Sequence, residues 1–195
     1  MEAIETRTVE AGGRTYRISV FPDSDAECPS EWEGWRLVSF SHRHRSYEAP
    51  ERYCKGLDEA GYPLPAHIGL SRMLDTGTAF WLSYYEHGLC RWSLMGEGPY
   101  CRWDSTRVAG ILLWERPPPE LPSGYQPREA DARRFLDIYT DWANGQVYGY
   151  DIEILTSCAS CGSEQAGLVE SCFGIYGLET ALSEAEAQLQ PPSKE

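Results

Sequence analysis

Alternating apolar and polar positions predict several β-strands along the chain. Residues 14–21 (RTYRISVF) alternate clearly, and Pro22 with the polar residues after it ends the pattern. Two further runs flank Glu86-His87-Gly88, which predicts a hairpin with its tip at His87-Gly88. An apolar run before the Pro117-Pro118-Pro119 break is typical of a buried strand. The strands predicted in this first part are residues 14–21, 35–41, 79–85, 89–94 and 108–114.

Helical periodicity is clearest in the last third of the chain. Phe135, Ile138, Tyr139 and Trp142 fall at i, i+3, i+4 and i+7, which is one face of a helix. Pro127 suits the first turn of that helix, and Asn144-Gly145 suits its left-handed end. A final helix carries Leu178, Ala181, Leu182, Ala185 and Leu189 on one face and ends at Pro191-Pro192. Shorter helical segments are predicted at residues 50–61 and 66–74.

A strand pair is predicted between the two late helices. Residues 146–155 form one strand and 167–172 its antiparallel partner, with the sequence Cys158-Ala159-Ser160-Cys161 in the loop between them. The whole order predicts an α+β fold, with a mainly antiparallel sheet and two or three helices, of which the late ones pack on one face. The expected parts are a β-rich segment 1–115, a proline-rich connector 116–126 and a helix-hairpin-helix segment 127–190, packed together as one domain.

Charge narrows the classes of partner. The chain has 195 residues, with 30 acidic and 17 basic side chains and a net charge of -13. Residues 120–195 carry 13 acidic and 4 basic residues, a net of -9, whereas residues 1–119 carry a net of only -4. This field repels phosphates, so direct nucleic-acid binding is not expected. It attracts a basic groove on another protein, or it serves only to keep the protein in solution.

Other features of the sequence bear on the cellular compartment in which the protein is expected. No apolar run approaches the roughly 20 residues that span a bilayer, and the acidic, polar N-terminus MEAIETRTVEAGG does not resemble a signal peptide. A cytoplasmic protein with mostly reduced cysteines is therefore expected, and the odd number of seven cysteines argues against a disulfide framework.

Several segments together resemble a family of uncharacterised proteins encoded by bacteriophages, plasmids and their hosts. The resembling segments are residues 24–45, 80–88, 101–113, 143–153 and 170–177. They include Tyr85-Glu86-His87-Gly88, Trp103-Asp104-Ser105 and Ser171-Cys172-Phe173-Gly174, where the family has forms close to YDHSG, PWDSG and SCWGFYG. The resemblance implies an accessory protein of a mobile element, with an anti-defence role as one possibility, and it carries no assigned activity.

Two groups of residues could hold a metal ion. Cys158 and Cys161 have the two-residue gap of a zinc knuckle, and Cys172 across the hairpin is a candidate third ligand. The alternatives are two reduced cysteines in a tight loop or a redox pair. Glu86, His87 and Asp104 are a second candidate group for a divalent metal or a proton relay, and otherwise they are turn and hairpin-tip residues.

No motif predicts a catalytic site. The chain has no GxSxG, HExxH, P-loop or GxGxxG, and its cysteines and histidines specify no nucleophile-base pair. The basic segment His42-Arg43-His44-Arg45 is expected either to hold a phosphate or to pair with the protein's own acidic residues.

The sequence therefore predicts a non-enzymatic, cytoplasmic interaction protein without a required cofactor, although zinc is possible. Its expected target is a basic, nucleic-acid-binding surface of a host defence protein such as a CRISPR effector or a restriction enzyme, with exposed Trp or Tyr as anchors. A dimer is also possible. The alternative is a small metal-binding module or metal-dependent enzyme that uses Cys158 and Cys161, or His87 and Asp104. The expected partner-binding residues are Glu129, Asp131, Asp137, Asp141, Asp151, Glu153, Glu164 and Glu170.

Overall fold

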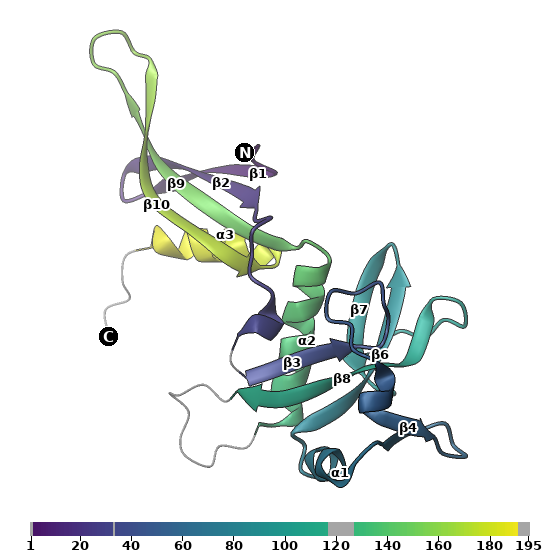
Figure 1. Cartoon of the computed structure of the whole chain (residues 1–195). Coiled ribbons are helices and arrows are strands. Elements are labelled where there is room, and N and C mark those ends of the chain that lie inside the picture. The colour runs from purple at the N-terminus through teal and green to yellow at the C-terminus, as the bar shows by residue number, and fades with distance from the viewer. Residues whose placement is uncertain (1, 33, 117–126, 191–195) are drawn as a thin grey trace. The chain divides into compact units, whose positions relative to one another are not determined.

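The computed structural model describes residues 2–32, 34–116 and 127–190 and has an α+β fold with mainly antiparallel sheets (Figure 1). The chain divides into two compact units. Unit 1 combines Met1–Glu27 with Asp141–Glu195, and unit 2 is Cys28–Thr140. The N-terminal residues thus belong with the C-terminal residues, because the second strand of the chain pairs with a strand that begins at Val147.

Unit 1 is a four-stranded antiparallel sheet with a helix on one face. The strand order is β1-β2-β9-β10. Gly12 and Gly13 join β1 to β2 with φ values of 57° and 73°, the left-handed conformation of a type I′ hairpin turn. β10 forms one edge of the sheet, and register shifts after Leu168 and after Cys172 interrupt its pairing with β9. The elements are β1 (Glu5–Ala11), β2 (Arg14–Pro22), β9 (Val147–Ser157), β10 (Glu164–Tyr176) and α3 (Leu178–Gln188).

The core of unit 1 lies between this sheet and α3. Alternate residues of each strand point to the same face, so Ile18 and Val20 of β2 lie beside Ile152 and Tyr150 of β9. The predicted apolar face of α3 packs against them, and the buried cluster is Ile18, Val20, Tyr150, Ile152, Ile175, Ala181, Leu182 and Ala185. The sequence prediction for this helix face is confirmed.

Unit 2 is built on a second antiparallel sheet with strand order β3-β8-β6-β7. β8 lies in the interior of the sheet and pairs with β3 and β6. The predicted hairpin is present, because β6 and β7 end in the pair His87↔Leu89 around Gly88. The strands of the sheet are β3 (Gly34–Ser39), β6 (Ala79–His87), β7 (Leu89–Leu94) and β8 (Ser105–Arg116). A separate pair of short strands is β4 (Cys54–Leu57) and β5 (Pro63–Pro65). The helical elements are the 3-10 turns η1 (Pro29–Glu31) and η2 (Pro50–Arg52) and the helices α1 (Ile68–Asp75) and α2 (Glu129–Ala143).

Two helices contact the sheet of unit 2. Leu70 of α1 is buried in a cluster with Val38, Ala79, Ile111 and Leu113 from three strands. α2 contacts β7, where Thr140 Oγ1 accepts a hydrogen bond from the Trp92 backbone N–H; the rings of Trp92 and Tyr139 also meet edge-on, with centroids 6.3 Å apart. The two late helices therefore pack on different sheets, α2 on that of unit 2 and α3 on that of unit 1.

Three predictions from the sequence need correction. The division into segments 1–115 and 127–190 differs from the two units, because β1 and β2 pair into the sheet of β9 and β10. The helix predicted at residues 50–61 is wrong: only Pro50–Arg52 makes a 3-10 turn, and β4 and β5 follow. Gly56 and Gly61, at φ values of 144° and 80°, favour this open strand pair over a helix. The expectation that the late helices pack on one face is also corrected, because α2 and α3 pack on different sheets. In addition, β1 was not predicted.

Other predicted features fall partly outside the described residues. The connector 116–126 is described only at Arg116, and Pro191-Pro192 also lies outside. Within the three described stretches, no helix is both long and apolar enough to cross a bilayer.

An ion-pair network joins β3 to β8 and to the segment after β3. Arg36 donates through Nε to Glu115 at 2.6 Å and also pairs with Glu48, while the Tyr53 hydroxyl donates to Glu48 at 2.8 Å. Burial raises the pKa of Glu48, but the hydrogen bonds from Tyr53 and Arg36 outweigh it and hold that pKa below its ordinary value of 4.5.

Glu48→Gln is expected to lower the free energy of unfolding at pH 7 by about 1–3 kcal/mol, because Arg36 loses a charged partner while the side-chain shape is kept. A carboxyl whose pKa is depressed on folding stabilises the fold above its unfolded pKa, and this contribution is lost as pH falls through the folded pKa. The difference between wild type and variant should therefore shrink between pH 7 and about pH 3. Urea unfolding at the two pH values measures it; a constant difference contradicts the charge-based account.

Candidate functional site

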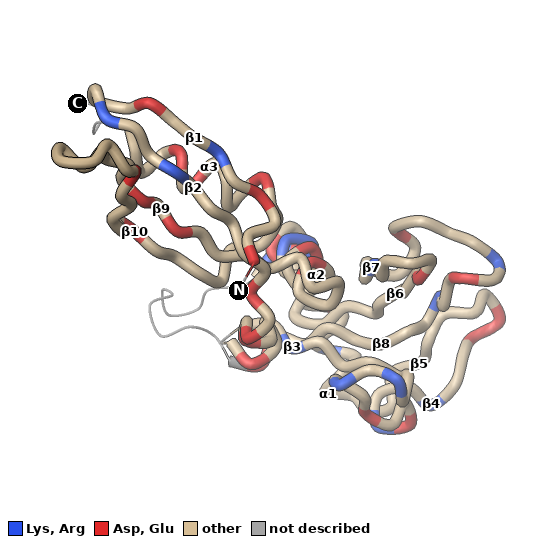
Figure 2. Tube along the Cα trace, turned by 90° about the horizontal axis from the view of Figure 1, so that it is seen from above, with Lys and Arg blue, Asp and Glu red and all other residues tan. Residues whose placement is uncertain are grey.

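The acidic charge is concentrated in unit 1. Its sequence carries 15 acidic and 4 basic residues, a net charge of -11, whereas the sequence of unit 2 carries 15 acidic and 13 basic residues, a net of -2. Acidic positions occur on β1, β9, β10 and α3 of this unit (Figure 2). The difference in net charge is therefore larger between the two folded units than between residues 1–119 and residues 120–195 of the sequence.

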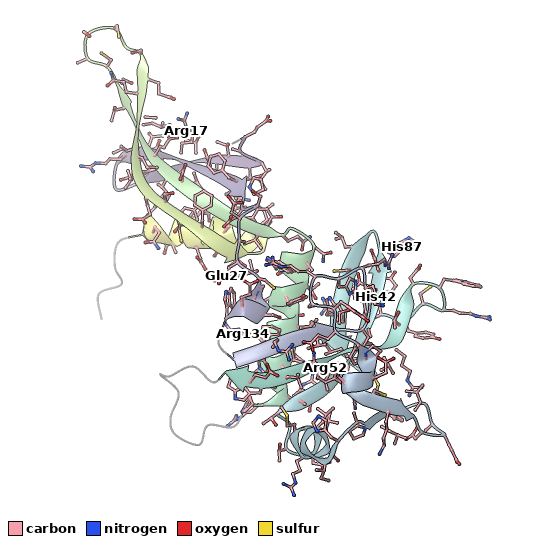
Figure 3. All side chains as sticks on the ribbon, in the orientation of Figure 1. Arg17, Glu27, His42, Arg52, His87 and Arg134 are labelled. Carbon is pink, nitrogen blue, oxygen red and sulfur yellow. The ribbon has the colours of Figure 1, made fainter. Side chains whose placement is uncertain are left out.

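Two arginines of unit 1 are taken up by ion pairs within the unit. Arg7 contacts Glu5 at 3.3 Å and Glu186 at 3.0 Å. Arg17, labelled in Figure 3, contacts Glu153 at 2.9 Å and Glu164 at 3.6 Å. These bridges hold β1 to α3 and β2 to the β9–β10 hairpin, so their first role is to join elements of the unit.

The structure separates the eight predicted partner-binding acids. Glu129, Asp131 and Asp137 lie in unit 2, and the other five lie in unit 1. Several have local partners: Glu129 contacts Arg133, Asp131 the Arg128 backbone N–H, Asp137 Arg91, Asp151 the Ser171 hydroxyl, and Glu153 and Glu164 both contact Arg17. Asp141 is half-buried in the last turn of α2, and Glu170 is exposed on β10.

Exposed acids on β10 and α3 define the acidic surface, by which we mean Glu170, Glu179 and Glu184. Glu170 lies opposite Ile152 in the β9–β10 register, which places it on the face that α3 covers. Burial raises the pKa of Tyr150, and the negative charges of Glu170 and Glu184 raise it further, so both carboxylates lie near that ring. No ion pair to a basic side chain is found for these three residues in the part of the chain that the structure describes.

The cysteine pair occupies the tip of the β9–β10 hairpin. Cys158 Sγ lies 3.0 Å from Ser160 Oγ, and Cys161 Sγ lies 3.1 Å from Ser163 Oγ. Hydrogen bonds from the Ser160 hydroxyl and then from the Ser160 and Cys161 backbone N–H groups lower the pKa of Cys158 to about 6. The thiolate form is therefore favoured at this exposed loop.

Cys172 does not join this pair. It lies opposite Tyr150 in the register, and Tyr150 is seven residues from Ser157 at the start of the loop. At the rise of an extended strand this is roughly 23 Å. Among the described residues, no group of three or more His, Cys, Asp or Glu side chains is arranged to hold a metal ion. The predicted three-cysteine set is thus not brought together within one chain.

His87 and Asp104 meet as the sequence suggested. His87, labelled in Figure 3, lies at the tip of the β6–β7 hairpin. Its Nδ1 atom is 3.2 Å from Asp104 Oδ2. The Glu86 carboxylate does not join this pair and instead contacts the Arg43 guanidinium at 3.2 Å. The result is one exposed hydrogen-bonded pair instead of a group of three.

The basic segment 42–45 pairs with the protein's own residues. Arg45 contacts Glu31 at 2.8 Å, in addition to the Arg43–Glu86 pair. His44 Nδ1 lies 2.7 Å from Ser39 Oγ, and burial lowers the pKa of His44. Ser39 is fully buried, so its hydroxyl is closed to a substrate and serves to hold the segment. The prediction of self-pairing is confirmed.

Two exposed aromatic side chains lie in the segment between β7 and β8. Tyr100 and Trp103 are 83% and 84% exposed, which is far above the other tyrosines and tryptophans that the structure describes. The Arg102 guanidinium lies 5.2 Å from the centre of the Trp103 ring. Sequence reasoning did not single them out as exposed, although Gly96, Gly98 and Pro99 beside them indicate a loop where no strand buries a ring.

Two clefts of unit 2 are lined by both polar and apolar side chains. A cleft of about 460 Å³ borders Tyr84, Glu97, Tyr100 and Arg107, and another of about 290 Å³ borders Glu31, Arg36, Arg45 and Glu48. Neither is lined by a histidine. In the smaller cleft, Arg36 with Glu48 and Arg45 with Glu31 form the ion pairs already described.

Comparison of the chain with family models, with curated proteins and with solved structures gives no match.

Proposed function

We propose that the chain is a non-enzymatic interaction protein whose acidic unit 1 binds a basic surface of another protein. The observation that supports this most directly is the net charge of -11 on unit 1 beside -2 on unit 2. A field of one sign raises the rate of encounter with an oppositely charged groove and repels wrong partners. Within unit 1, the acidic surface of Glu170, Glu179 and Glu184 is a candidate for this contact, because its carboxylates are exposed and make no ion pair among the described residues.

The proposed partner is a nucleic-acid-handling protein of a host defence system. A groove that holds a phosphate backbone is rich in Lys and Arg, so a row of carboxylates can occupy it in place of phosphates. The resemblance to proteins of phages and plasmids favours an anti-defence role of this kind. Tyr100 and Trp103 of unit 2 are candidates for aromatic anchors that would add salt-independent affinity.

Reversing the acidic surface is expected to weaken partner binding selectively. The test variant is Glu170→Lys, Glu179→Lys and Glu184→Lys together, used against the partner recovered from host lysate by the tagged chain at low salt. Because steering raises association rates by about 10- to 1000-fold, we expect the association rate to fall at least about 10-fold. Surface plasmon resonance at two ionic strengths measures this rate, and wild-type binding should weaken as salt rises.

The matched control is Glu51→Lys, Glu59→Lys and Asp75→Lys, three exposed acids of unit 2 that change the net charge by the same amount. The control should retain most of the wild-type association rate. Equal losses in both variants would mean that only net charge matters, and binding that is insensitive to salt would contradict the proposal.

A further inference from the structure

The tip of the β9–β10 hairpin extends beyond the four-stranded sheet of unit 1. β2 pairs with β9 only as far as Thr15↔Leu155. Beyond that point β9 and β10 continue as a two-stranded ribbon, whose last pair is Ser157↔Glu164 (Figure 1). The loop that closes it, residues 158–163, has exposed or half-buried side chains throughout. The two cysteines are therefore presented at the end of a projecting arm.

The loop has the conformation that a metal-binding cysteine knuckle needs. The Gly162 N–H donates to the Cys158 carbonyl oxygen, and the Cys158 N–H donates to the Ser163 carbonyl oxygen, both at 2.8 Å. Gly162 has a φ of 73°, a conformation that a glycine adopts without strain. Each sulfur atom contacts a serine hydroxyl of the loop, and the Cys161 side chain lies within hydrogen-bonding reach of Cys158. Both sulfur atoms are thus held on one side of the loop.

The described residues of one chain supply only two of the four ligands of a structural zinc site at this place. Structural zinc takes four ligands in a tetrahedron, commonly four cysteine thiolates. Cys172 lies roughly 23 Å along the strand and cannot reach the loop. No third histidine, cysteine or carboxylate joins the pair within the described stretches. A tetrahedral site here therefore needs two more ligands than the described residues of one chain supply.

The charge distribution favours a second copy of the same hairpin tip as the source of the other two zinc ligands. Residues 154–163 carry no charged side chain, and Glu164 next to them is paired with Arg17. Apart from the cysteine thiolates, whose charge a shared zinc ion offsets, two tips can therefore approach without like-charge repulsion. The rest of unit 1, with its net charge of -11, repels its own copy and so disfavours broader contact. A tip that carries two cysteines and no acidic or basic residue is the part of this unit best suited to contact a second copy of itself.

We propose that the hairpin tip is half of a zinc site, and that Cys158 and Cys161 of a second copy complete it. The resulting Zn²⁺ ion has four thiolate ligands and joins two chains tip to tip. Each thiol that is still protonated releases its proton to solvent as its Zn–S bond forms, so zinc binding releases protons and strengthens as pH rises. This inference does not rest on the proposed partner of unit 1.

Zinc titration of the purified, reduced full-length chain tests the proposal. We expect saturation at one zinc ion per two chains, together with a doubling of the mass measured by light scattering. Co²⁺ in place of zinc should give the visible absorption of a tetrahedral tetrathiolate site, and a chelator should restore the monomer. A chain that remains a monomer with no bound zinc, or that binds one zinc ion per monomer, overturns the proposal.

Single cysteine variants assign the ligands. Cys158→Ser and Cys161→Ser should each abolish both zinc binding and the zinc-dependent dimer. Cys172→Ser and Cys101→Ser are the controls and should retain both. Loss of the site in Cys172→Ser, or a dimer that forms without metal and dissociates on reduction, would contradict the tetrathiolate assignment; the second result would indicate a disulfide instead. Partner binding by Cys158→Ser in the lysate experiment reports on the proposed function separately.

Discussion

Leu182→Asp is expected to lower the free energy of unfolding of unit 1 by about 3–5 kcal/mol, because it places an uncompensated carboxylate in the core. Leu182 is 2% exposed and lies on the buried face of α3, in the cluster with Tyr150 and Ile152. Among the described residues, no basic side chain is buried, so the new charge has no buried partner. Hydrogen exchange followed by mass spectrometry should show lost protection in β2, β9 and β10.

Ser183→Asp is the matched control. It adds the same charge one residue away, on the exposed side of α3. Substitutions at such surface positions change stability by about 0.5 kcal/mol or less, so protection of the sheet should stay close to wild type. If both variants lose protection equally, the added charge alone accounts for the effect and the burial argument fails.

Gly110→Ala is expected to destabilise unit 2 by about 3 kcal/mol, because β8 has no room for a side chain at this position. A Cβ atom built on Gly110 would lie 2.2 Å from the Val38 carbonyl oxygen and 3.3 Å from the Ser39 Cα atom. Both atoms belong to the backbone of β3, which pairs with β8 through Ser39↔Gly110. The neighbouring strand would have to move, and thermal or urea unfolding measures the cost.

Gly149→Ala provides the comparison. Its added Cβ would also lie 2.2 Å from another atom, but that atom belongs to the ring of Phe173. This ring is 46% exposed and can rotate into solvent, so we expect a loss of no more than about 1 kcal/mol. Adding Phe173→Ala to Gly149→Ala should remove most of that loss. A cost as large as that of Gly110→Ala would mean that the Phe173 ring is held in place.

Local patterns predicted most of the elements. The end of α2 follows from Asn144-Gly145, and Gly145 has the left-handed φ of 68° that such an end requires. β1 was missed for a physical reason: it is an edge strand whose residues 5–8 are all polar, and Arg7 is accommodated by ion pairs. The pairing of β2 with β9 could not be predicted, because no short-range pattern joins strands so far apart in the sequence.

The candidate site was predictable to a similar degree. The position of Cys158 and Cys161 in a hairpin loop and the meeting of His87 with Asp104 follow from turn signals. The engagement of Glu153 and Glu164 by Arg17 depends on the unforeseen β2–β9 pairing. For the same reason the charge asymmetry is stronger between the folded units than between the two ends of the sequence.

The pairing of β2 with β9 also has a consequence for the order of events on the ribosome. β1 and β2 are synthesised first, but their partner strand is translated only after all of Cys28–Thr140. Unit 2 is continuous in sequence, so its strands can pair while unit 1 is still incomplete. Until β9 emerges, the edge of β2 that pairs with β9 is unpaired. Ile18 and Val20 of β2 are then not yet buried by the residues of β9, β10 and α3. The nascent chain is therefore most exposed to aggregation, and most in need of a chaperone, during the translation of unit 2.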